Sequence, residues 1–218
     1  GRRHQMFEYF DLLGLDAPAK PNIASLVIPD GVAAACRQRM AGHLPDIKNG
    51  PVIGMLPGAA HGPSKCWPVG NFLKVARDLI ERHACSVILL GSKHEVGTCA
   101  EITAGASGPI ADFSGKTSLQ ELAAMLSYCD VVITNDSGGM HLSAAVGTPV
   151  VAIFGITDPR ITGPLGHGHR ILSAATASRS RDLAPDSHEA RNALRSILPE
   201  VVLAAVKEVL DAGARRPA

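Results

Sequence analysis

Residues 131–154 read VVITNDSGGMHLSAAVGTPVVAIF, and this stretch decides the fold. An apolar run of strand length is followed by a polar turn, a short helical pattern that ends at Gly147 and Pro149, and a second apolar run. Both apolar runs are continuous, which is typical of parallel strands that are buried on both faces of a sheet. The stretch therefore predicts one strand–helix–strand unit of a parallel sheet.

The same alternation of strand, loop and helix begins at Pro51 and continues along the chain. Ser118 and Glu121 form the pattern of a capping box at the start of one of the helices. The predicted fold class is α/β, with a Rossmann-like, doubly wound parallel sheet. Further strands are predicted at 52–56, 86–90 and 110–112, and further helices at 69–82, 95–104, 119–127 and 199–210.

The first part of the chain departs from this alternation. Apolar residues at helical spacing predict a helix at 4–13, and a Pro-rich connector with a short strand at 25–28 follows. Another helix is predicted at 33–41. The chain starts without Met and opens directly into the helical pattern, so we expect that it was cut out of a longer protein.

Composition excludes several classes of protein. Hydrophobic residues make up 46% of the chain and charged residues 19%, which is typical of a globular domain with a sizeable core. A formal net charge of +1 gives no indication of a nucleic-acid partner. The apolar runs are shorter than the roughly 18 residues of a membrane span. The N-terminus also lacks the apolar segment of a signal peptide.

The cysteines and arginines are predicted to have structural rather than functional roles. The five cysteines are scattered without CxxC spacing, which argues against a metal site or disulfide framework and fits a reducing compartment. Residues 170–195 are rich in arginine, but Asp182, Asp186 and Glu189 offset the charge. We expect a solvated surface there, and contact with an acidic partner is the alternative.

The polar turn between the strands at 131–134 and 150–154 is the strongest candidate for a binding loop. Asp136 or Ser137 can cap the following helix, and Gly138 and Gly139 allow a ligand to approach the backbone. Amides at a helix N-terminus favour an anion such as phosphate. His141 lies on the same helical face as Ser137. The alternative is a structural cap followed by a histidine that only packs.

Three further loops leave the same predicted end of the sheet. In residues 57–68, small residues admit a ligand and Lys65 offers a charge to phosphate, although the pattern is not a P-loop. Glu95 can accept hydrogen bonds from a ribose, or simply stabilise the first turn of a helix. The backbone of 113–119 can contact adenine or form a plain capped turn. We expect Trp67 to anchor its loop to the core, and Lys65 is alternatively a surface residue.

Together these segments resemble glycosyltransferase family 9, the lipopolysaccharide heptosyltransferases, and within it the heptosyltransferase II type. The resemblance covers roughly residues 50–210, and residues 1–30 resemble the end of the family's N-terminal domain, including its FDLLG helix at 10–14. The motifs that carry it are PGA at 57–59, KCWP at 65–68, GS at 91–92, TNDSGGMH at 134–141, and the segment 154–164 from FG to TGP.

The resemblance implies a two-domain GT-B fold in which the C-terminal domain holds an ADP-heptose donor. Residues 46–218 would be that domain, and residues 1–45 a remnant of the N-terminal acceptor domain with its linker. Lys65 and His141 would stabilise the leaving group. The implied donor-binding residues are Gly58 and Lys65 in the first loop, Glu95 at the ribose, Thr117 and Leu119 near adenine, and Asp136, Ser137, Gly138, Gly139 and His141 around the diphosphate and sugar.

The resemblance also implies the reaction and its place. Heptose passes from ADP-heptose to the lipopolysaccharide inner core, with inversion, in the cytoplasm at the inner face of the inner membrane. No tightly bound cofactor or metal is implied. The family's catalytic base lies in the N-terminal domain and has no match here, so we expect no transfer by this chain alone. The cysteines that some relatives carry within 173–194 are absent.

Two alternatives remain open from the sequence. Another GT-B enzyme, such as a UDP-sugar transferase or epimerase, would share the fold and differ in the base that it prefers. A catalytically silent nucleotide-binding fragment would keep the donor loops without the chemistry.

Overall fold

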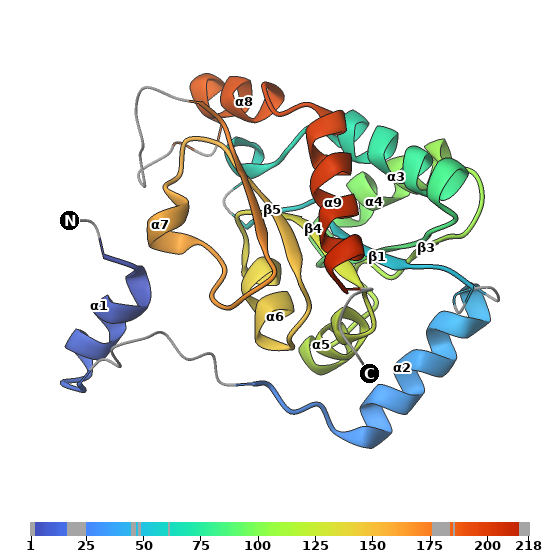
Figure 1. The fold of residues 1–218 in the computed structure, drawn as a ribbon, viewed down its shortest axis with the longest axis horizontal. Helices are drawn as coiled ribbons and strands as arrows, with labels where there is room; N and C mark the ends of the chain where they lie inside the picture. Colours follow the sequence, from blue (N-terminus) through green and yellow to red (C-terminus); the bar gives the residue numbers. More distant parts are fainter. Residues whose placement is uncertain are drawn as a thin grey trace.

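A parallel sheet of six strands forms the centre of the molecule, with helices on both faces (Figure 1). The computed structural model describes residues 3–16, 25–44, 47, 49–60, 62–175, 184 and 186–213. The strands lie in the order β3-β2-β1-β4-β5-β6 and every neighbouring pair is parallel, which confirms the predicted doubly wound sheet. Their bounds are β1 Val52–Leu56, β2 Ser86–Leu89, β3 Ile110–Asp112, β4 Val131–Asn135, β5 Val150–Phe154 and β6 Arg170–Ser173.

Most of the described helices fall into two layers that bury separate cores. The β1 residues Ile53 and Met55 belong to the core under one helix layer. Val52 and Leu56 of the same strand belong to the core under the other layer. Successive strand residues therefore face opposite cores, which explains why β5, whose residues alternate between the two cores, is apolar at every position. The first layer holds α3 (Val69–His83), α4 (Val96–Gly105), α8 (His188–Arg195) and α9 (Pro199–Gly213), and the second holds α2 (Asp30–His43), α5 (Leu119–Ser127) and α6 (Gly138–Ala145).

From β1 the sheet grows in one direction through β2 and β3 and in the opposite direction through β4, β5 and β6. β1 pairs with β2 on one side and with β4 on the other, with Leu56 opposite Thr134. The loops that follow β1 and β4 therefore leave the sheet side by side and in opposite layers. Such a switch point is where open α/β sheets bind ligands. The topology thus brings the two strongest candidate loops together.

Helix α2 packs on the sheet unit rather than lying apart from it. Cys36 and Met40 are buried in the same core as α5 and α6. Tyr128, at the C-terminal end of α5, donates a hydrogen bond to the Ala33 carbonyl oxygen at 2.9 Å. The domain boundary at residue 45 stays a prediction, and α2 adds to the core on the C-terminal side of it.

The predicted strand at 25–28 is wrong. Residues 25–29 carry no regular secondary structure, and Val27 is 85% exposed. The Leu26 amide donates to the Ala145 carbonyl oxygen at the end of α6, not to a neighbouring strand. An apolar run of this length forms a strand only where a sheet edge is available to pair with it.

Several short elements were not predicted from the sequence. They are α7 (Pro159–Thr162), β6, α8 and the 3₁₀ turns η1 (Pro63–Lys65) and η2 (Lys93–Glu95). In the edge strand β6, partly buried residues alternate with exposed ones, so it lacks a continuous apolar run. The buried face of α8 consists of Ala190, Ala193 and Leu194, a weak apolar signal. Residues 17–24 of the predicted connector and 176–183 of the arginine-rich stretch lie outside the described residues.

Other predicted elements are confirmed with small shifts at their ends. The helix predicted at 4–13 is α1 (Gln5–Leu12), and the helix predicted at 33–41 is the longer α2. The capping box of Ser118 and Glu121 is formed as predicted. Within the described part of the chain, no helix combines the length and apolar character needed to cross a membrane.

Candidate functional site

A cavity of about 1080 Å³ opens at the carboxyl ends of β1, β2 and β4. Its volume suits a nucleotide-sized ligand. The loop after β1, the end of β2, the start of α5 and the start of α6 all contribute to its wall. Of the predicted donor-binding residues, the structure brings together at this wall Gly58, Glu95, Thr117, Leu119, Ser137, Gly138 and Gly139. The lining does not include Lys65, Asp136 or His141.

Lys65 forms an ion pair with Asp136 across the switch point. The Lys65 Nζ atom lies 2.7 Å from Oδ2 of Asp136, and the two side chains are only 16% and 7% exposed. This pair accounts for the burial of both charges, since a buried charge needs a partner. An ammonium has three donors, so two remain for other acceptors. The charge that Lys65 can offer to phosphate is nevertheless partly compensated within the protein.

The predicted capping of α6 by Asp136 or Ser137 is wrong. Ser137 occupies the N-cap position without a side-chain hydrogen bond to the helix, and its hydroxyl lies 3.3 Å from that of Thr134. The Asp136 carboxylate faces Lys65 instead. The carboxylate of Asp136 is held by the opposite charge of the Lys65 ammonium at 2.7 Å, so it is not used as a helix cap. The first turn of α6 therefore lacks the acceptor that a capping side chain supplies.

Gly138 and Gly139 have different roles in this turn. A Cβ atom on Gly138 would have no heavy atom within 4 Å, so the backbone there is open to a ligand. A Cβ atom on Gly139 would lie 2.6 Å from Cδ1 of Leu56, so this residue is small because α6 packs tightly on β1. The prediction of close ligand approach therefore fits Gly138 better than Gly139.

Asn135 holds the two switch-point loops together. Its side-chain oxygen accepts a hydrogen bond from the Trp67 amide at 2.9 Å, and its Nδ2 donates to the Pro57 carbonyl oxygen at 2.8 Å. Asn135 is fully buried, and no role was predicted for it beyond the motif. A polar residue that ends a buried apolar strand is the signal that could have identified it.

Trp67 anchors its loop as predicted. The side chain is 1% exposed, and its indole N–H donates to the Ile197 carbonyl oxygen at 2.9 Å. The ring also meets Phe72 edge-on at 5.1 Å. The loop after β1 is thus fixed at its C-terminal end.

Glu95 stabilises its own turn and lines the cavity. Its Oε2 accepts a hydrogen bond from the Ser92 amide at 2.5 Å within a capping box, which confirms the predicted helix-start role. A Cβ atom on Gly58 would overlap the Glu95 side chain, so Gly58 is small because Glu95 packs against it. Contact between Glu95 and a ribose stays a prediction.

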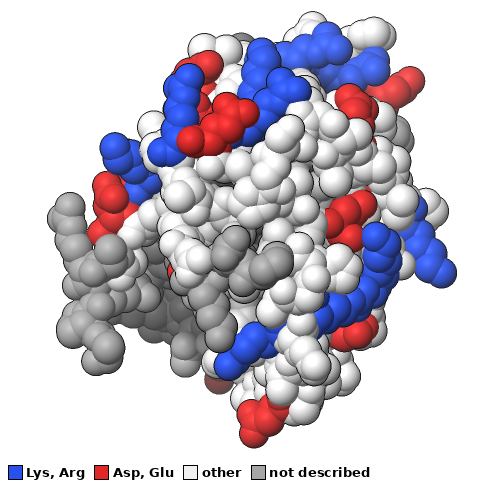
Figure 2. Space-filling model, turned by 90° about the vertical axis from the view of Figure 1, so that its right-hand side faces the viewer, with Lys and Arg blue, Asp and Glu red and all other residues white. Residues whose placement is uncertain are grey.

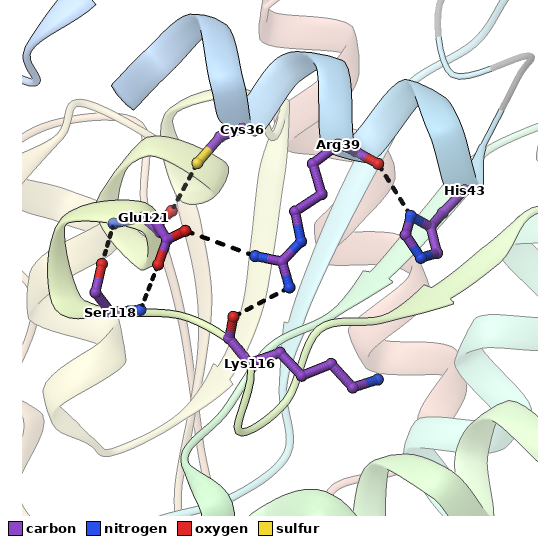
Figure 3. Close-up of polar contacts among 6 residues, drawn as sticks. All are labelled: Cys36, Arg39, His43, Lys116, Ser118 and Glu121. Carbon is purple, nitrogen blue, oxygen red and sulfur yellow. Dashed lines mark hydrogen bonds and ion pairs between the residues drawn. The ribbon is translucent and has the colours of Figure 1, made fainter. Parts of the chain in front are cut away.

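Helix α2 contacts the segment next to Thr117 and Leu119, and Figure 3 draws the contacts of its Arg39 with Lys116 and Glu121. The Arg39 guanidinium donates to the Lys116 carbonyl oxygen at 3.0 Å and lies 3.6 Å from the Glu121 carboxylate. It also lies over the ring of Phe113, 5.4 Å from the centroid. Leu119 is 72% exposed beside the cavity, an apolar surface that a base could cover.

His141 lies near the Lys65–Asp136 pair. Loss of hydration lowers the pKa of His141, His4 and Lys65 lower it further, and Asp136 raises it. His4 itself contacts the Gly163 carbonyl oxygen at 3.1 Å. The lowered pKa favours the neutral form of His141, so a role for it is that of a neutral hydrogen-bonding group.

Two arginines of α8 line the cavity and were not predicted as site residues. Arg191 and Arg195 belong to the arginine-rich stretch that we expected to be solvated surface, and for these two residues that expectation is incomplete. Their spacing of four residues would have placed them on one face if the helix had been predicted.

Charge elsewhere on the surface is mixed. Figure 2 shows basic and acidic side chains interleaved over one face of the molecule.

Among the described residues no group of three His, Cys, Asp or Glu side chains could hold a metal ion. The thiols are free, and four of them are buried.

Comparison with known proteins places the chain in a class and then in a family. The fold is that of one half of a GT-B glycosyltransferase. It matches the structure of E. coli ADP-heptose lps heptosyltransferase II with a TM-score of 0.77 and 27% identity, over 91% of this chain and 56% of that one. A glycosyl transferase family 9 structure from Veillonella parvula matches with a TM-score of 0.79 and 25% identity, over 97% of this chain and 61% of that one.

The sequence matches glycosyltransferase family 9 (heptosyltransferase) over residues 4–193, and the chain belongs to this family. Lipopolysaccharide heptosyltransferase 2 of Salmonella typhimurium is 34% identical over 74% of this chain and 47% of that protein. Lipooligosaccharide heptosyltransferase 2 of Haemophilus influenzae is 34% identical over 73% of this chain and 47% of that protein. The chain thus spans about half the length of these curated relatives.

Proposed function

We propose that this chain is the donor-binding part of a heptosyltransferase that moves heptose from ADP-heptose to the inner core of lipopolysaccharide. The observation that carries the proposal is the cavity at the β1–β4 switch point, whose wall contains most of the donor-binding residues predicted from the sequence. Family membership supports the reaction class. The donor follows from the similarity to a protein described as an ADP-heptose heptosyltransferase.

In this proposal the adenine lies against Leu119 and Thr117, and the ribose faces Glu95. The diphosphate approaches Gly138 at the open start of α6, where helix amides favour an anion. Asp136 precedes Gly138 by two residues and is paired with Lys65. Lys65 uses a remaining donor for the leaving phosphate, although Asp136 compensates part of its charge.

The proposed chemistry is stabilisation of the leaving group. The acceptor hydroxyl oxygen forms a bond to the anomeric carbon, the bond from that carbon to the phosphate oxygen breaks, and ADP leaves with an additional negative charge. Fixed donors that meet such charge typically lower the barrier by about 2.7–4 kcal/mol each. Neutral His141 donates a hydrogen bond to phosphate or to a sugar hydroxyl.

The acceptor side of the reaction is also part of the proposal. The lipopolysaccharide acceptor and the base that takes the hydroxyl proton belong to an N-terminal domain, of which residues 1–45 are the remnant and linker. The chain alone then binds donor without transferring heptose. The reaction takes place in the cytoplasm, with peripheral contact to the inner membrane, and needs no tightly bound cofactor.

Calorimetric titration of the chain with ADP, UDP and GDP tests the proposal. We expect saturable binding that is tightest for ADP. Preference for UDP would indicate the alternative GT-B enzyme, a UDP-sugar transferase or epimerase. Transfer activity of the chain by itself would contradict the assignment of the base to another domain.

A further inference from the structure

Helix α8 is held rigidly over the loop that carries Lys65. The Ser187 amide donates a hydrogen bond to Oγ of Ser64 at 2.9 Å, and Oγ of Ser64 donates to the Ala184 carbonyl oxygen. Leu194 is 1% exposed, and a Cβ atom on Gly155 would lie 3.0 Å from its Cγ. The helix is therefore fixed both to η1 and to the end of β5, which positions its remaining side chains.

Arg191 and Arg195 lie next to each other on the face of α8 that meets the cavity. They are four residues apart, a spacing at which two side chains on a helix are neighbours and like charges repel. Arg191 contacts the ring of His188 at 3.3 Å. Over the described part of the chain, neither guanidinium lies within 4.0 Å of a carboxylate. Among the described residues the pair is thus a concentration of positive charge without a carboxylate in ion-pair contact.

Two other charged groups near the cavity, Lys65 and Glu95, already have partners within the protein. Lys65 is paired with Asp136 at 2.7 Å, and Glu95 is occupied by the Ser92 amide. The cavity therefore has an excess of positive charge at α8, and an anion placed there would relieve the repulsion between the two arginines. Guanidinium groups suit phosphate because they donate two parallel hydrogen bonds to its oxygens.

We propose that Arg191 and Arg195 bind the diphosphate of the nucleotide in the cavity, as a second cationic contact beside Lys65. The proposal rests on the proposed function, because it assumes that a nucleotide diphosphate occupies this cavity. It assigns α8 as a phosphate-binding element, which neither the sequence motifs nor the ion pair of Lys65 indicated.

Titration of Arg191→Ala, Arg195→Ala and the double variant with ADP and with adenosine tests the proposal. We expect each substitution to weaken ADP binding roughly tenfold, which is typical for one hydrogen bond to a charged group. Adenosine has no phosphate, so its affinity should change by less than roughly twofold, the size of effect expected from a site that does not contact the ligand. Alanine is a strong helix former, so α8 should be retained.

The matched control is Arg82→Ala combined with Arg170→Ala. Both residues are ion-paired with acids, at Asp78 and Glu208, and neither lines the cavity. This control removes the same net charge and should leave ADP binding nearly unchanged. Circular dichroism and a thermal melt of each variant confirm that it is folded.

The outcomes separate the inference from the proposed function. Unchanged ADP affinity in the α8 variants, or an equal loss for ADP and adenosine, would overturn the inference alone. An equal loss in the control would reduce the effect to net charge and would also overturn it. Absence of ADP binding by the unmodified chain would overturn the proposed function, and the inference with it.

Discussion

The Lys65–Asp136 pair gives the sharpest prediction, because its two members should affect stability and ligand binding differently. Lys65→Met leaves the Asp136 carboxylate, which is 7% exposed, without its cation. Removal of one partner from a buried ion pair costs about 3–5 kcal/mol. We expect about 3 kcal/mol for Lys65→Met, at the lower end because the pair is not fully enclosed. Asp136→Asn should cost about 1–2 kcal/mol, since it keeps an acceptor oxygen and leaves an ammonium that water can still reach.

Binding should change in the opposite sense for the second variant. Lys65→Met removes a phosphate donor and should weaken ADP binding at least roughly tenfold. Asp136→Asn frees the Lys65 charge from its internal partner, so ADP affinity should be retained or increased although the protein is less stable. Urea unfolding followed by circular dichroism measures the first effect, and calorimetric titration measures the second.

A double variant and a surface control complete the experiment. The double variant should be less destabilised than the sum of the two single variants, by about 0.5–3 kcal/mol. Arg170→Met breaks an exposed pair with Glu208 and should cost at most about 1 kcal/mol. An equal loss of ADP affinity in Lys65→Met and Asp136→Asn would refute the reasoning, because the pair would then act only as structural support.

Three further predictions concern other parts of the molecule. Arg39→Ala should weaken ADP binding more than Arg37→Ala, a matched change on the same helix whose contact is the Tyr128 hydroxyl; equal titration curves for the two would contradict this. Burial lowers the pKa of His169, whose Nδ1 accepts a hydrogen bond from the Val150 amide. The contribution of His169 to stability is therefore present above its unfolded pKa of about 6.5 and is lost as pH falls below that value. Urea unfolding at pH 7.5 and at pH 5 should show a smaller drop in the free energy of unfolding for His169→Ala than for the unmodified chain. Cys66 lines the cavity whereas the other four thiols are buried, so a thiol reagent should modify Cys66 first and ADP should slow the reaction; the same rate with and without ADP would place the ligand elsewhere.

The sequence was most informative where strands are buried on both faces. The runs 131–133 and 150–154 are apolar at every position and alternate between the two cores, so strand position and parallel pairing could be predicted from them. The edge strand β6 and helix α8 escaped prediction because their contacts are made by few or small side chains. Residues 25–28 misled the prediction because an apolar run carries no information on whether a pairing edge lies beside it.

For the site, the loops could be predicted but the contacts within them could not. Position at the carboxyl end of the sheet follows from element order, so Gly58, Thr117 and Gly138 were predicted together. The partner of Asp136 depends on how two loops meet, which no local pattern encodes, and a cap was predicted where an ion pair forms. Arg191 and Arg195 reach the cavity only because α8 folds back over η1.

A crystal structure of the chain with ADP tests the central claim most directly. The proposed function predicts ADP in the cavity at the β1–β4 switch point, with adenine against Leu119 and the diphosphate at the start of α6 beside Gly138. ADP bound on another face of the molecule, or bound in the cavity with its phosphates directed toward Leu119, would contradict the account.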